Sequence, residues 1–572
     1  MKVGLNRSDE FVGLGKQMQA GWLNLTRKPL KWRLESLYRA ADDPVLKSDM
    51  SQLETEVIAL FRDALDNRPP SFKAFEAAVG KFQRLRAFTL LKEETGVTRL
   101  ERSLLDALSD RLDKVSLRLR ASEQLVAQSD DAPVGWSEIV ARLRPAAGPP
   151  IYVYETLAQE SHLERAAESS RQNATERMRL AAEQFGGEGA IADRLRARKR
   201  KTRQTAASEF ADVLKSGRST AAFALTQACA IPGRTDKAQR AIDANGWNLS
   251  AASDIALERA PALAARYAAF KARKLKVNDF AWYDVPTNLQ RNGRKSWRAG
   301  LAESLSSLSA LHPDLAFEAR QLIADGAVNA VEGGSAYTYP LLHADSDAGK
   351  RRAGPFVRAP YDGTRDAQLS LAHELGHAAH QLAARDRGPT VGDPGLALAE
   401  TGALASEIAF FNDDDIMLAE RDFAMLCRQP ALAAFEASVL ALRGEEASPQ
   451  YLDAIWLDEM TNHYGEAISL DGYASHWARV ASFVREPGYP VAYQLGWSLA
   501  GHVCEMIARS GHPAQEAYLS VLKAGGRMDY EAAVHRLGAT GVESLLHQAY
   551  DRAEARLDKV DPRNGGHKRS GT

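Results

Sequence analysis

Two histidines and a glutamate in the segment HELGHAAH, residues 373–380, have the spacing of a metal site. His373 and His377 are four residues apart, so on a helix their imidazoles project from one side, a turn apart, as two ligands of one tetrahedral zinc ion require. Glu374 can reach the open position of such a metal without binding it and take a proton from a bound water. The segment therefore predicts a zinc site that activates water.

Chance is a weak explanation of this pattern, because about 0.02 accidental occurrences are expected in a chain with 13 histidines. A structural histidine cluster is the alternative, but residues 366–385 otherwise read as a core helix with Leu371 and Leu375 on its apolar face. Buried imidazoles without a metal would leave ring nitrogens unsatisfied there. His380, seven residues after His373, is too far along the axis to share the metal, so a hydrogen-bonding role is predicted for it.

A catalytic zinc needs a third protein ligand and keeps a fourth position for water. The next strongly helical segment, residues 395–411, is apolar apart from two hydroxyl residues and two acids, Glu400 and Glu407, which are seven residues apart and face the same side. Glu400 follows His377 by 23 residues and is the predicted ligand, while Glu407 is predicted to hold a histidine N–H. A buried acid paired with an arginine is the alternative for both.

The elements that must position these side chains are mostly helices. Apolar residues recur at three- and four-residue intervals, as they do along residues 100–112, and Ala, Leu, Arg and Glu are abundant. Only residues 333–339 and 354–360, just before the histidine helix, have the Gly and Pro borders and β-prone centres of short strands. The sequence predicts a mainly α fold with a small β-sheet near that helix.

Breaks in the helical pattern suggest how the chain is divided. A Pro- and Gly-rich run at residues 145–150 and a second at 186–189 interrupt the early helices. We expect an N-terminal helical region over residues 1–204, a catalytic metallopeptidase region over 205–560 and a disordered polar tail over 561–572.

The composition gives no overall reason to bind nucleic acid or a membrane. Of 572 residues, 45% are hydrophobic and 26% charged, and the formal net charge is -1. The densest basic run, residues 194–203, has seven basic residues but no interleaved aromatics for base stacking, so a solvated connector is preferred to a nucleic-acid patch. Three widely spaced cysteines and no apparent secretion signal or bilayer-length apolar run favour the cytoplasm.

Taken together, the motifs resemble the oligoendopeptidase F and thimet oligopeptidase family of zinc metallopeptidases. The likeness includes the fuller pattern H-E-x-G-H-x-x-H, the preceding segments GGSAY and GPFVRAPYDGT, and the downstream helix AETGALASE. Further on, RGEEASPQYLDAIWLDEMTNHYG and then PGYPVAY, after Trp477, follow in the family's order. The resemblance covers roughly residues 205–555 and, more loosely, the N-terminal helices.

The resemblance implies a two-lobed helical metallopeptidase whose deep channel admits short unstructured oligopeptides. It implies one zinc ion per chain, held by His373, His377 and Glu400. Glu374 would be the general base of peptide hydrolysis. The family's oxyanion-stabilising tyrosines correspond to Tyr489 and Tyr493, for which an aromatic pair packed in the core is the alternative. Neither the cleavage preference nor the oligomeric state follows from the sequence.

The chain departs from the family near these tyrosines. Family members usually carry a histidine five or six residues before Tyr489, where this chain has Phe483 and Val484, and His476 is out of register. A catalytically weak or silent peptide-binding homologue with the same fold is therefore the alternative function.

Overall fold

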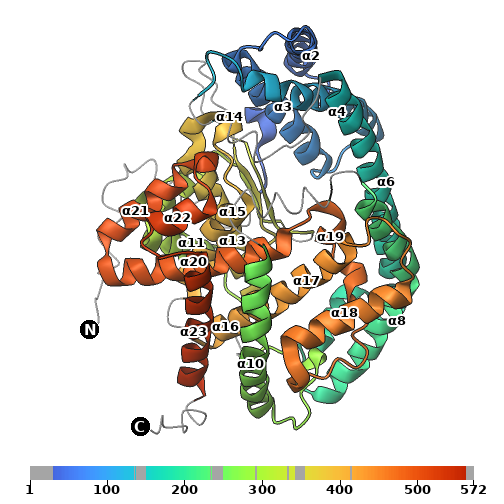
Figure 1. The fold of residues 1–572 in the computed structure, drawn as a ribbon, viewed down its shortest axis with the longest axis vertical. Helices are drawn as coiled ribbons and strands as arrows, with labels where there is room; N and C mark the ends of the chain where they lie inside the picture. Colours follow the sequence, from blue (N-terminus) through green and yellow to red (C-terminus); the bar gives the residue numbers. More distant parts are fainter. Residues whose placement is uncertain are drawn as a thin grey trace.

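Long helices build most of the protein, and three short strands lie beside one of them (Figure 1). In this computed structural model, the described residues are 30–133, 136, 150–231, 234, 249–289, 293–331, 334–341, 354–411 and 415–561. The predicted tail from residue 562 onward lies outside the described residues. The mainly α fold with a small sheet is confirmed.

The N-terminal half contributes helices at the top and right of Figure 1. They are α2 (Pro44–Leu65), α3 (Phe72–Glu93), α4 (Arg99–Val126), α6 (Pro150–Glu183), α7 (Glu188–Leu195) and α8 (Arg200–Cys229). Local sequence sets their starts: Thr98 and Glu101 form a reciprocal capping box at the beginning of α4. α6 and α8 pack along each other, and the predicted division between residues 204 and 205 falls within α8.

The basic run at residues 194–203 is engaged by acids. Arg203 is fully buried and bonds to Asp284, with a distance of 2.5 Å from Nη2 to Oδ1. Arg194 pairs with Glu209. These internal ion pairs account for part of the basic density in this connector.

The second half begins with α10 and runs to the sheet. Its elements are α10 (Leu249–Leu275), α11 (Trp297–Leu311), α12 (Pro313–Ala324), β1 (Val328–Asn329), β2 (Tyr337–Tyr339) and β3 (Phe356–Arg358). The strand order is β1-β3-β2, with β1 parallel and β2 antiparallel to β3. β2 and β3 fall within the two predicted extended segments, and β2 is an edge strand beside the helix that follows.

The remaining elements follow the sheet. They are α13 (Arg365–Ala384), α14 (Gly388–Val391), α15 (Leu396–Phe411), α16 (Asp415–Phe423), a π-helical turn (Ala424–Arg428), α17 (Gln429–Leu440), α18 (Pro449–Tyr464), a 3₁₀ turn (His476–Arg479), α19 (Ser482–Arg485), α20 (Tyr489–Ser510), α21 (His512–Leu522), α22 (Tyr530–Arg536) and α23 (Val542–Val560). Among the described helices, none combines the length and apolar character needed to cross a bilayer.

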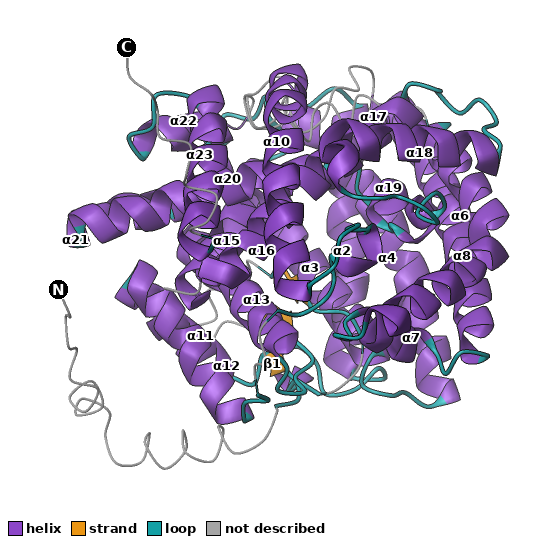
Figure 2. Ribbon diagram, turned by 90° about the horizontal axis from the view of Figure 1, so that it is seen from below, coloured by secondary structure: helices purple, strands orange, loops and turns teal. Residues whose placement is uncertain are grey.

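Helix α15 packs between α13 and α20 (Figure 2). Glycines allow the close approach on both sides. A Cβ added at Gly376 of α13 would lie 2.7 Å from Cα of Ala403, and one at Gly496 of α20 would lie 2.9 Å from Cβ of Glu400. Because no larger residue fits without moving a helix, these contacts fix where α15 presents its two buried acids.

Candidate metal centre

Helix α13 carries His373, Glu374 and His377. It begins after Thr364, whose hydroxyl accepts the N–H of Ala367, so the helix start is capped. Its apolar face is buried, as predicted, with Leu371 and Leu375 fully inaccessible to solvent. This packing anchors the helix and turns the two histidines toward α15.

The three predicted ligands meet in one place. The Nε2 atoms of His373 and His377 are 3.1 Å apart. Glu400 faces both: its Oε2 is 3.6 Å from Nε2 of His373, and its Oε1 is 3.6 Å from Nε2 of His377. Oε2 of Glu400 has no hydrogen-bond partner among the described residues, although the residue is only 1% exposed. Two imidazole nitrogens and a buried carboxylate that converge in this way fit a divalent cation such as zinc.

Burial shapes the charge of this group. It raises the pKa of the Glu400 carboxyl to about 7, although the positive charge of His373 and the Tyr489 hydroxyl act in the opposite direction. Burial and the charge of His373 hold the pKa of His377 well below its usual value. The His377 ring also has a hydrogen bond with the backbone of Ala399. A bound metal cation would favour the unprotonated forms of Glu400 and His377, which are the forms that ligate a metal.

Glu407 holds the other side of His373, as predicted. His373 Nδ1 lies 2.7 Å from Oε1 of Glu407, whose Oε2 is 2.5 Å from Nη2 of Arg421 on α16. Burial opposes ionisation of Glu407, but the charge of Arg421 and the His373 hydrogen bond lower its pKa below the usual value. A charged Glu407 fixes the ring so that Nδ1–H donates and Nε2 faces Glu400. The sequence analysis did not identify Arg421.

Glu374 lies beside the group and not in it. Its carboxylate Oε2 accepts a hydrogen bond from the Thr338 hydroxyl of β2 at 2.7 Å, and the same hydroxyl is 3.0 Å from the Glu374 backbone oxygen. Burial raises the pKa of Glu374, which is only 6% exposed. No motif pointed to Thr338; its only sequence indication was its place in the predicted extended segment, residues 333–339, before the histidine helix.

Tyr489 and Tyr493 lie at the same centre. The Tyr489 hydroxyl donates to Oε1 of Glu400 at 3.0 Å, the two tyrosine rings are 5.1 Å apart, and the Tyr493 ring is 6.4 Å from the His373 ring. Tyr489 was expected in a loop before the helix, but it is the first residue of α20. Gly488, with φ of 87°, turns the chain just before it, and Pro490 is tolerated because it lies in the first turn.

His380 is not part of the metal group. It is buried and has a hydrogen bond with the backbone of Leu398, while its Nδ1 has no partner among the described residues. Burial lowers its pKa to about 4, so the ring is neutral near pH 7. The structure therefore gives His380 the predicted hydrogen-bonding position.

A second histidine–glutamate group lies at the surface, and the sequence analysis missed it. It consists of His312, His512 and Glu516. Nε2 of His312 is 3.2 Å from Oε1 of Glu516, and Nε2 of His512 is 3.6 Å from the same oxygen. His512 and Glu516 are four residues apart on α21, but His312 comes from the distant α11–α12 corner, so the spacing of the pair did not by itself indicate the group.

The fold and the buried group together define a class of mainly helical proteins with a candidate His–His–Glu metal centre. No protein-family model matches the chain. The chain is 24% identical over 329 residues to oligoendopeptidase F, chromosomal, of Lactococcus lactis subsp. cremoris, covering 52% of this chain and 51% of that protein. It is also 24% identical over 328 residues to the group B oligopeptidase PepB of Streptococcus agalactiae, again covering 52% and 51%. The chain thus spans about half the length of the curated relatives it matches.

Solved structures share the fold over a longer stretch. The structure of PZ peptidase A with an inhibitor matches with a TM-score of 0.69 at 14% identity, covering 89% of this chain and 97% of that one. Oligoendopeptidase-F from Enterococcus faecium matches with a TM-score of 0.55 at 18% identity, covering 91% and 97%. The resemblance to oligoendopeptidase F is confirmed, and this chain has the fold of those peptidases.

Proposed function

We propose that the protein is a zinc-dependent endopeptidase that hydrolyses short, unstructured oligopeptides. The convergence of His373, His377 and Glu400 on one point, with the Glu374 carboxylate beside it, carries this proposal. These three residues would hold one zinc ion, which when bound supplies a Lewis acid for the scissile carbonyl and for water. The related oligoendopeptidases support peptides as the substrate class.

Glu374 moves the proton. It takes a proton from the attacking water and then delivers it to the departing amine, as a general base and acid in turn. Burial raises the pKa of this carboxyl above its usual value, which favours its accepting the proton. The Thr338 hydroxyl holds Oε2 of Glu374, so the carboxylate stays oriented during the transfer.

Tyr489 and Tyr493 stabilise the oxyanion. Each phenol can donate a hydrogen bond to the carbonyl oxygen as it gains negative charge, and losing one such donor typically costs about 10²–10³ in rate. In the structure Tyr489 donates to Glu400, so its hydroxyl must turn from Glu400 to the substrate. Tyr493, next to it on α20, is the second donor.

The edge strand β2 provides a place for the peptide backbone. Because β2 pairs only with β3 within the described sheet, its other edge can accept an extended peptide through main-chain hydrogen bonds. Such pairing tolerates varied side chains. Thr338 belongs to this strand, so a peptide held there lies next to Glu374. Because its three cysteines are free, we also propose a cytoplasmic location.

A quenched fluorogenic oligopeptide tests the proposal. We expect the zinc-loaded protein to cleave it, a chelator to abolish cleavage and added zinc to restore it. Glu374→Gln should keep its zinc and lose activity by about 10²–10⁴-fold, the usual contribution of a general base. Wild-type cleavage by this variant would make the mechanism wrong. Absence of cleavage of any peptide by the zinc-loaded wild type would favour the silent peptide-binding alternative.

A further inference from the structure

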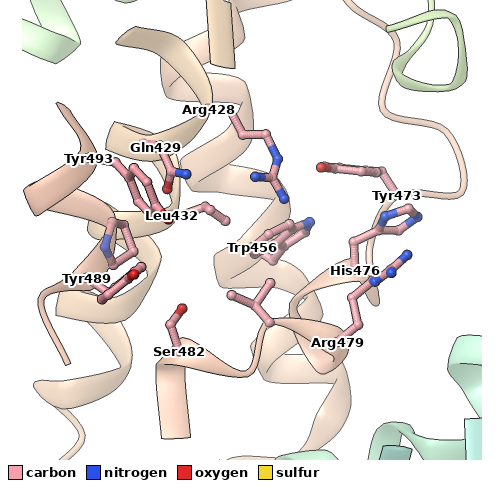
Figure 3. Close-up of a pocket in the computed structure, with 12 residues that line it drawn as sticks. Arg428, Gln429, Leu432, Trp456, Tyr473, His476, Arg479, Ser482, Tyr489 and Tyr493 are labelled. Atoms are coloured by element: carbon pink, nitrogen blue, oxygen red, sulfur yellow. The ribbon is translucent and has the colours of Figure 1, made fainter. Parts of the chain in front are cut away.

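A cavity of about 410 Å³ lies next to the candidate metal centre (Figure 3). Tyr489 and Tyr493 line one side, and Arg428 and Arg479 line the other. Because Tyr489 bonds to Glu400, the cavity and the metal centre share a wall. Tyr489 therefore contacts both the cavity and the predicted metal ligand Glu400.

The two arginines differ from the ion-paired arginines of this protein; Arg428 is partly buried and Arg479 is exposed. Arg203 and Arg421 are each paired with a carboxylate, whereas Arg428 and Arg479 have no ion pair among the described residues. The Arg479 guanidinium lies over the ring of Phe210, 4.9 Å from its centre. The surrounding protein, which removes water from the guanidinium, and the charge of Arg428 lower the pKa of Arg479, whereas Glu188 and Tyr473 act in the opposite direction.

His476 adds a third polar group to the same wall. It is only 7% exposed, it lines the cavity, and its Nε2 has no hydrogen-bond partner among the described residues. The rings of Trp282 and Tyr473 pack against it at 4.4 and 4.1 Å, so its orientation is fixed. Burial and the two arginines hold its pKa well below the usual value, which keeps the ring neutral and able to donate one N–H.

Two unpaired guanidinium groups and an unsatisfied imidazole around one cavity form a recognition site for an anion. Arginine binds a carboxylate through parallel N–H···O bonds, and such charge-assisted bonds are stronger than those between neutral groups. Leu432 and Pro490 add apolar lining, so the cavity has room for a side chain or a chain end as well as its charge. For a protein that acts on peptides, the anion with this chemistry is a carboxylate.

We propose that this cavity is a specificity subsite in which Arg428, Arg479 and His476 bind a carboxylate of the peptide substrate. The carboxylate is either the C-terminus of the peptide or an acidic side chain near the scissile bond. The inference rests on the proposed peptidase function. It adds a substrate class to that function, namely oligopeptides with a carboxylate that can reach the cavity beside the metal centre.

Three versions of one quenched peptide test the subsite and distinguish the two sources. The first ends in a free carboxylate, the second in an amide, and the third is the amide with one glutamine replaced by glutamate near the cleavage site. We expect kcat/KM to be about 10–100-fold higher for one of the charged peptides than for the neutral amide, the usual effect of a charge-assisted hydrogen bond. The charged peptide that is preferred identifies the source.

The variants Arg428→Gln and Arg479→Gln should bring the charged-to-neutral ratio of kcat/KM close to one, and Arg428→Lys should retain part of it. Arg298→Gln, at an exposed arginine of α11, is the matched control and should keep the wild-type ratio. Equal kcat/KM values for all three peptides in the wild type, or an unchanged ratio in both glutamine variants, would overturn the subsite.

Binding separates this inference from the proposed function. If the wild type cleaves none of the peptides, the peptidase proposal fails, but fluorescence anisotropy with the same labelled peptides still measures the charge preference of the intact protein. If cleavage occurs, the Glu374→Gln variant serves for the binding measurement. Tighter binding of a charged peptide that Arg428→Gln abolishes supports the subsite, and equal binding of all three contradicts it.

Discussion

Among the described residues, two groups of two histidines and one glutamate are close enough to share a cation, one buried and one at the surface. In the buried group, Glu407 accepts from Nδ1 of His373, so Nε2 is left to face Glu400. In the surface group, Nδ1 of His312 accepts the N–H of Asp314 at the start of α12, so its Nε2 carries the proton that points at Glu516. The hydrogen bonds therefore leave Nε2 of His373 as a potential metal ligand, whereas they make Nε2 of His312 a hydrogen-bond donor.

Rigidity separates the groups further. The Glu400 side chain is 1% exposed, and its helix is packed on both sides, whereas the side chains of His512 and Glu516 are 72% and 56% exposed. Ordering two exposed side chains around an ion costs conformational entropy that the buried group has already lost on folding. Composition and proximity alone do not make a metal site; the hydrogen bonds behind the ligands and the packing around them do.

Removing a direct ligand should give the largest difference between the groups. His377→Ala and Glu400→Gln should each lower zinc affinity by more than about 100-fold, because outer partners alone are worth 10–100-fold. The matched changes His512→Ala and Glu516→Gln should leave one zinc per chain after dialysis. Elemental analysis measures this stoichiometry. Zinc retained in Glu400→Gln but lost in Glu407→Gln would move the ligand to Glu407.

Removing the support behind a ligand should have a smaller effect. Glu407→Gln takes away the charged acceptor of His373 Nδ1–H and leaves Arg421 unpaired, so zinc affinity should fall by about 10–100-fold. Competition with a chelator measures the affinity. The Tm of the zinc-free variant serves as the control: a lower Tm with unchanged affinity would mean that the Glu407–Arg421 pair only stabilises the fold.

The smallest of the expected effects is a difference between a buried and an exposed glutamate in how the stability of the protein depends on pH. Burial raises the pKa of Glu436, which accepts the N–H of Gly488, from 4.5 to about 8. Between these values the folded state holds a proton that the unfolded chain has lost, so the free energy of unfolding falls as the pH rises. The Glu436→Gln variant does not lose stability in this way. The Tm of the variant minus the Tm of the wild type should therefore increase by about 2 °C or more between pH 5 and pH 8.

Glu516 gives the opposite sign and is the control. Its hydrogen bond with His312 lowers its pKa, so its contribution is present above its usual pKa and is lost only as the pH falls below it. The Tm difference between Glu516→Gln and wild type should therefore stay constant from pH 5 to pH 8. A constant difference for Glu436→Gln as well would contradict the effect of burial.

Local periodicity was enough to predict the elements that hold the candidate site. The four-residue spacing of His373 and His377 requires one helix face, and the spacing of Glu400 and Glu407 puts both acids on one side of the next helix. The observed helix Arg365–Ala384 differs from the expected range 366–385 by one residue at each end, and Leu396–Phe411 differs from 395–411 by one residue at its start. β1, with two residues, is too short to leave a pattern of its own.

Contacts between distant segments could not be predicted in this way. Arg421 reaches Glu407 from α16, and Thr338 reaches Glu374 from β2 across 36 residues. Arg428 and His476 come to one cavity from two turns with no shared motif. A single arginine or threonine has no characteristic spacing, so only the packing of the helices reveals which of the many in the chain faces the site.

The position of α15 between Gly376 and Gly496 restricts how this protein can change over evolutionary time. A methyl group gained at either glycine would push aside a helix that bears a site residue, so a neutral-looking change in the interior would also alter the chemistry. In the surface group, the exposed side chains of His512 and Glu516 have no such restriction, although His312 is buried and caps α12. Tolerance to mutation should therefore be lowest at these two helix contacts. In a deep mutational scan, the fraction of tolerated substitutions should be lowest at Gly376 and Gly496.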